Sequence, residues 1–172
     1  MEDKLNAPVY KQSFRTAQEN QELKLYYQSN ELNQECASAI DKAISDSNYD
    51  TFYYDLKSAA KTVLNEFGAD RVAWVLAGVL QRNAFDGRYS SANKNWADDQ
   101  EIPPEYSCVH LTSHPTVVDG FIDRVRQEVE SPTQDISSRP SISSQLQDNK
   151  QNSQKNDQPE KGHSKHSNDP AL

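Results

Sequence analysis

Apolar residues recur every three or four positions in this chain until Glu130, and the spacing ends there. The clearest run lies between Thr51 and Phe67. It comprises Phe52, Tyr53, Leu56, Ala59, Ala60, Val63, Leu64 and Phe67. Because this spacing puts them on one side of a helix, it predicts an amphipathic helix that packs on a core. Asp50 is expected to cap its start and Gly68 to end it in a left-handed conformation.

A second helix is expected over residues 70–81, at the centre of the fold, because its apolar residues cover nearly every side. These residues are Val72, Ala73, Trp74, Val75, Leu76, Val79 and Leu80. Helical spacing predicts further helices over residues 10–17, 22–45 and 116–130. Pro115 suits the first turn of the last of these, with Ser113 or His114 as its cap.

The segment between residues 83 and 111 is less regular. Asp86-Gly87 marks a turn, residues 90–96 are expected to form a short helix, and Pro103-Pro104 prevents a helix from continuing. Residues 108–111 are the one candidate strand. Taken together, the chain is predicted to be all-α, a small bundle of four to five helices with one long structured loop.

From Ser131 onward the composition changes to Ser, Gln, Asn, Asp and Lys. The apolar residues of this stretch are Ile136, Ile142, Leu146, Ala171 and Leu172. They offer too little apolar surface to offset the entropy of an ordered chain. We therefore expect a helical acidic domain over residues 1–130 and a disordered polar tail over residues 131–172.

All of the net charge of −8 lies in the expected folded part, since residues 1–130 hold 13 Lys/Arg and 21 Asp/Glu. A negative domain repels phosphate backbones, so we expect no direct binding of nucleic acid. The charge is compatible with a basic protein partner, with a surface that imitates nucleic acid, or simply with solubility.

The first residues, 1–14, lack the apolar run of a signal peptide, and no stretch reaches the roughly 18 apolar residues that span a membrane. The two cysteines, Cys36 and Cys108, make no disulfide framework. We expect a cytoplasmic protein without membrane association.

Motifs that carry chemistry are missing from the sequence. Cys108-x-His110-x3-His114 is a single cluster of soft ligands, whereas a structural zinc site usually pairs two clusters. There is no nucleophile elbow, no HExxH helix and no glycine-rich phosphate loop. We interpret Cys36 as a core residue, and we expect neither a metal, nor a cofactor, nor an identifiable catalytic residue.

A turn, two aromatic residues and two cations fall together between Asp86 and Trp96. The candidate binding residues are Asp86, Arg88, Asn93, Lys94, Trp96 and His114. In a structural interpretation, Trp96 anchors the loop and the cations pair with nearby carboxylates. In a functional interpretation, the loop displays binding residues from a rigid scaffold.

An acidic run follows this loop and gives the second candidate site. Asp98, Asp99 and Glu101 come directly after Trp96, and Asp119 and Asp123 lie on the expected last helix. The five carboxylates are expected to form either an acidic face or an ordinary solvated loop.

Several short motifs in this region resemble those of a domain family of unknown function. They are Phe67-Gly68-x-x-Arg71-Val72, Val75-Leu76-Ala77, Asp86-Gly87-Arg88, Asn93-Lys94-x-Trp96-Ala97, Ser113-His114-Pro115 and Asp119-Gly120-Phe121. The resemblance covers roughly residues 9–130. It implies a domain carried on conjugative and related mobile elements of Gram-positive bacteria, and it carries over no activity, cofactor or catalytic residue.

This context favours a non-enzymatic protein-binding accessory of a mobile genetic element. Its specific form is an acidic anti-defence inhibitor, similar to antirestriction or anti-CRISPR proteins, with a basic or DNA-handling host protein as partner. Two alternatives stay open. One is an enzyme or enzyme accessory that uses the loop between Asp86 and Trp96 with His114, and the other is a bridging module in a conjugation complex.

Overall fold

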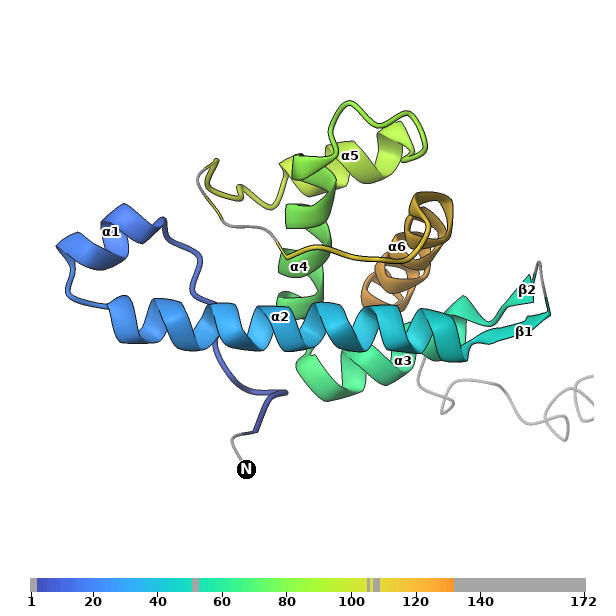
Figure 1. The fold of residues 1–172 in the computed structure, drawn as a ribbon, viewed down its shortest axis with the longest axis horizontal. Helices are drawn as coiled ribbons and strands as arrows, with labels where there is room; N and C mark the ends of the chain where they lie inside the picture. The colour runs from blue at the N-terminus through green and yellow to red at the C-terminus, as the bar shows by residue number, and fades with distance from the viewer. Residues whose placement is uncertain (1–2, 51–52, 105, 107–108, 132–172) are drawn as a thin grey trace, which may run out of the picture. The chain divides into compact units, whose positions relative to one another are not determined.

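The computed structural model describes residues 3–50, 53–104, 106 and 109–131. Within these residues the chain forms six helices and one two-stranded hairpin (Figure 1). The elements are α1 (Phe14–Glu19), α2 (Leu23–Asp46), β1 (Asn48–Asp50), β2 (Tyr53–Tyr54), α3 (Leu56–Phe67), α4 (Ala69–Arg82), α5 (Ser91–Asp98) and α6 (Pro115–Glu130). The all-α prediction is confirmed. The predicted tail beyond Ser131 lies outside the described residues.

Helix α2 is the longest element, and its buried residues follow the predicted helical spacing. They are Tyr26, Ser29, Asn33, Cys36, Ala37, Ile40 and Ile44. This face packs against α3 and α4, and Figure 1 shows α4 crossing α2 rather than running alongside it.

Helix α4 is the predicted central helix, and its burial bears this out. Val72 and every residue from Trp74 to Leu80 are buried. On its other sides α4 contacts α3, α5 and α6. An edge-to-face contact between Trp74 and Tyr106, with ring centroids 5.4 Å apart, packs part of the long loop onto this helix.

Gly68 joins α3 to α4 without a connecting loop. Its φ of 77° is positive, as predicted, but its ψ of 157° is extended rather than left-handed helical. Gly68 therefore ends α3, with its N–H donating to the Leu64 carbonyl at 2.9 Å, and begins α4 at the next residue. A Cβ at this position would lie 2.9 Å from the carbonyl oxygen of Leu5, so the N-terminal segment passes directly over the junction.

The predicted start of the helix over residues 51–67 is wrong. Asp50 belongs to β1, which pairs antiparallel with β2, and helix α3 begins only at Leu56. Its cap is Asp55, whose side chain accepts a hydrogen bond from the Ser58 N–H at 3.1 Å. The reason is that the apolar stripe does not reach the core at this end: Tyr53 is exposed and packs across the hairpin on Tyr49 instead.

Helix α6 begins as predicted, with Pro115 in its first turn and the Nδ1 of His114 accepting from the Thr116 N–H at 3.3 Å. The preceding turn is fastened to α2 by Asp41. Its carboxylate accepts four hydrogen bonds, from the N–H and hydroxyl groups of Thr112 and Ser113, at 2.7 to 2.9 Å.

Residues 109–111 are not in a strand, and the remaining residue of that candidate strand, Cys108, lies outside the described residues. Among the helices that the structure describes, none has both the length and the apolar character needed to cross a bilayer.

Candidate functional site

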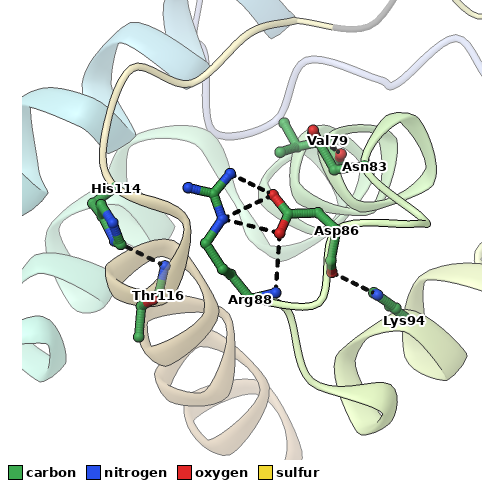
Figure 2. Close-up of polar contacts among 7 residues, drawn as sticks. All are labelled: Val79, Asn83, Asp86, Arg88, Lys94, His114 and Thr116. Atoms are coloured by element: carbon green, nitrogen blue, oxygen red, sulfur yellow. Dashed lines mark hydrogen bonds and ion pairs between the residues drawn. The ribbon is translucent and has the colours of Figure 1, made fainter.

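The turn at Asp86 is closed by its own side chains. The carboxylate of Asp86 accepts from Nε of Arg88 at 3.0 and 3.1 Å and from its Nη2 at 2.7 Å, while Nζ of Lys94 donates to the Asp86 carbonyl at 2.7 Å (Figure 2). The hydrogen bonds from Arg88 lower the pKa of Asp86 to about 2. Three of the candidate binding residues are thus bonded to one another.

Asn93 lies at the centre of a polar cluster that joins α5 to α6. It is 0 % exposed, and its Nδ2 donates to Oδ1 of Asp119 at 2.9 Å. Its Oδ1 accepts from Nη1 of Arg126 at 2.8 Å. Asp119 also accepts from the N–H of Ser90 at 2.9 Å, and the hydroxyl of Ser90 caps α5. We call Ser90, Asn93, Asp119 and Arg126 the Asn93 cluster.

Trp96 covers the same seam between the two helices. Its side chain is half-buried and packs on the core, and the Arg126 guanidinium lies 6.0 Å from its ring centroid. This cation–π contact adds to the hydrogen bonds of the Asn93 cluster. The predicted anchoring of the loop by Trp96 agrees with this packing.

His114 has a different setting. It lines a hollow of about 200 Å³ formed with residues of α2, the hairpin and α6, and Arg88, Asn93 and Trp96 are not among the lining residues. Its Nδ1 is engaged by the cap of α6 (Figure 2). The enzyme alternative, which needs the loop and His114 in one pocket, stays a prediction.

The five residues of the candidate acidic face divide into two groups. Asp119 is half-buried, and its carboxylate is engaged in the Asn93 cluster. The other four are exposed, and their side chains form no hydrogen bond or ion pair with any described residue: Asp98, Asp99, Glu101 and Asp123. Most other carboxylates are engaged, for example those of Glu35 and Glu66, which both pair with Lys4.

Arg71, which was not among the candidate site residues, is the one buried cation in the described part of the chain. It is 1 % exposed, and no described carboxylate pairs with it. Its Nη1 donates to Oδ1 of Asn33 at 2.6 Å and to the carbonyl of Ser29 at 3.0 Å. Its Nη2 donates to the carbonyls of Ala7 at 3.1 Å and Pro8 at 2.9 Å. An arginine in the first turn of a helix that is otherwise mostly apolar could have indicated this role in the sequence, because a buried arginine must find buried acceptors.

Cys36 is fully buried beneath this arginine network, as predicted for a core residue. Burial raises the pKa of its thiol to about 12, so the thiolate needed for nucleophilic or metal-binding chemistry is not formed near neutral pH. Within the described ranges, no three His, Cys, Asp or Glu side chains gather closely enough to hold a metal ion.

Comparisons with known proteins identify the family. No curated protein and no solved structure matches the chain. The sequence model of one family, described as "Protein of unknown function (DUF3849)", matches residues 9–130, which span every helix from α1 to α6. The chain therefore belongs to the DUF3849 family.

Proposed function

We propose that this domain is a non-enzymatic protein-binding module that holds a basic partner on an acidic face. The acidic face is made up of the exposed residues Asp98, Asp99, Glu101 and Asp123, together with the half-buried Asp119. The observation that carries the proposal is that the first four carboxylates are exposed and have no side-chain partner in the described part of the chain. Carboxylates left unpaired in this way remain available to the lysines and arginines of another protein.

The two helices that carry residues of this face, α5 and α6, are firmly joined. Asp98 ends α5 and Asp123 lies on α6, and the Asn93 cluster joins these two helices through buried hydrogen bonds. Carboxylates on rigidly joined helices lose little conformational freedom when a partner binds, which lowers the cost of association.

The net charge supports the same function. Residues 1–130 carry the whole charge of −8, which attracts a basic surface over a distance and repels nucleic acid. The resemblance to domains of mobile elements suggests a DNA-handling host protein as the partner. An anti-defence inhibitor that occupies the basic DNA channel of a host nuclease is the specific form that we propose.

Two matched variants test the acidic face. Asp98→Asn with Asp123→Asn removes two charges from the face. Glu31→Gln with Asp70→Asn removes two exposed charges from α2 and α4 that pair with no described residue. Both variants have the same net charge. Each is immobilised and exposed to a lysate of a Gram-positive bacterium at low salt, and bound proteins are eluted at high salt.

We expect the wild type and the second variant to retain the same basic protein, and the face variant to bind it about tenfold more weakly. Equal loss in both variants would mean that net charge alone attracts the partner. Equal retention in both, or the absence of any salt-sensitive partner, would refute the acidic face as a binding site.

A further inference from the structure

A groove runs between the N-terminal segment, residues 3–10, and the first half of α2. Its volume is about 570 Å³, which is large enough for two or three side chains of a ligand. Most of its surface is apolar, contributed by Pro8, Val9, Leu25 and Leu32. The acidic face shares none of the residues that line it.

The apolar part of the groove on α2 is formed by two leucines, Leu25 and Leu32, with Gln28 between them. Leu25, Gln28 and Leu32 are spaced by three and four residues, so they lie on one side of the helix, next to the stripe that faces the core. Leu25 is 53 % exposed although it lies within the longest helix. The chain's described residues leave this apolar surface open to a ligand.

The charged residues that line the groove favour a positively charged ligand. Asp3 and Glu22 are the charged residues among the described residues that line it, and no lysine or arginine is included. The hydroxyl of Tyr10 donates to Oε2 of Glu22 at 2.8 Å and holds this carboxylate at the groove. An apolar floor with a carboxylate rim suits an apolar side chain with a cation beside it, and it disfavours an acidic ligand.

Arg71 forms hydrogen bonds to both walls of the groove, the N-terminal segment and α2. Its Nη2 binds the carbonyls of Ala7 and Pro8 in the N-terminal segment, and its Nη1 binds the carbonyl of Ser29 in α2. The N–H of Tyr10 adds a bond to the hydroxyl of Ser29 at 2.9 Å. The groove is thus formed before a ligand arrives, and Arg71 is a positioning residue.

We propose that this groove docks a short segment of the basic partner in which leucine-like side chains alternate with lysine or arginine. The apolar side chains pack on Leu25, Leu32 and Val9, and the cations pair with Glu22 and Asp3. This inference rests on the proposed function, which supplies the basic partner. It adds a second binding site, which selects for apolar side chains as well as for positive charge.

Three capped peptides separate these two contributions. They are Gly-Lys-Leu-Lys-Leu-Gly, Gly-Lys-Ser-Lys-Ser-Gly and Gly-Glu-Leu-Glu-Leu-Gly. Each is titrated into the ¹⁵N-labelled full chain, and the amide shifts are followed by NMR. We expect the Lys-Leu peptide to shift the amides of Val9, Leu25 and Leu32, the Lys-Ser peptide to bind there about tenfold more weakly, and the Glu-Leu peptide not to bind.

Variants locate the binding. Leu25→Gln and Glu22→Gln should each weaken the Lys-Leu peptide about fivefold or more. Val129→Gln replaces an apolar residue that is 52 % exposed on α6, and it should leave the affinity unchanged. All three positions are at least partly exposed, so thermal unfolding should stay close to that of the wild type.

The outcomes separate this inference from the proposed function. If the Lys-Leu and Lys-Ser peptides bind alike and shift only Asp98, Asp99 and Asp123, the groove inference fails while the acidic face stands. If the Glu-Leu peptide binds the groove as well as the Lys-Leu peptide, the groove does not select a basic segment and the inference fails. If neither lysine peptide binds anywhere, both proposals fail.

Discussion

The substitution Gly68→Ala tests how the two central helices are joined. With φ of 77° and ψ of 157°, Gly68 has a backbone conformation that side-chain-bearing residues rarely adopt. The added methyl group would also lie 2.9 Å from the backbone oxygen of Leu5. Because that oxygen belongs to the main chain, it cannot move aside as the end of a flexible side chain would.

The expected loss of stability can be assembled from these two effects. A residue with a Cβ in this region of backbone space costs about 1–3 kcal/mol. Crowding against a main-chain atom adds about 1–3 kcal/mol, and the lower entropy of the unfolded alanine variant returns about 0.4–1 kcal/mol. We expect Gly68→Ala to lower the free energy of unfolding by about 2–4 kcal/mol and Tm by roughly 6–20 °C.

Urea unfolding followed by far-UV circular dichroism measures this loss, and two other glycines of the domain, Gly87 and Gly120, supply the controls. A Cβ on Gly87 would meet nothing within 4 Å, so Gly87→Ala should be neutral or slightly stabilising. A Cβ on Gly120, within α6, would meet only the Cδ1 end of Leu56 at 3.2 Å, so the gain in helix propensity should offset the crowding. A Gly68→Ala variant as stable as Gly87→Ala would refute the strained junction.

Three further predictions concern the polar and buried groups of Asp41, Cys36 and Asn93. Burial alone would raise the pKa of Asp41, but the hydrogen bonds that its carboxylate accepts outweigh burial and lower the pKa. The stability that Asp41 contributes is therefore fully present above the unfolded pKa near 4, and it is lost as pH falls through the folded pKa. Asp41→Asn should therefore cost about 1–2 kcal/mol at neutral pH and flatten the loss of stability below about pH 4, and an unchanged acid profile would contradict this. The Cys36 thiol should resist thiol reagents in a folded Cys108→Ser variant and react on unfolding, whereas rapid labelling of the folded protein would refute its burial. Asn93→Ala should lower stability by about 2–3 kcal/mol, while Asn95→Ala on the exposed side of the same helix should cost much less, and equal effects would argue against the Asn93 cluster.

Local chemistry accounts for the successful predictions. Helical spacing over residues 70–81 located α4, and Pro115 with His114 located the start of α6, because such signals depend on neighbours within one or two turns. The same reasoning failed at residues 50–55. There the tyrosines continued the helical spacing, but they pair across a hairpin, and that pairing depends on contacts outside one helix.

The residues of the candidate site show the same limit of local chemistry. The sequence indicated the loop from Asp86 and the acids after Trp96, but it did not indicate which of them would be engaged. Asp119 is bonded to residues 26 and 29 positions away in the chain, while Asp123, one turn further along α6, has no partner among the residues that the structure describes. Such a difference arises only when two helices meet.

The sequence by itself determined the approximate positions of most helices, which helix is central and that the domain carries negative charge, because apolar periodicity and charge are properties of the chain. Only the tertiary structure decided which acceptors the Nη1 and Nη2 groups of Arg71 bind, which carboxylates have no partner among the described residues and where a groove is left open on α2. Those outcomes depend on groups up to 64 residues apart becoming neighbours, and burial then favours arrangements in which most polar groups find a partner.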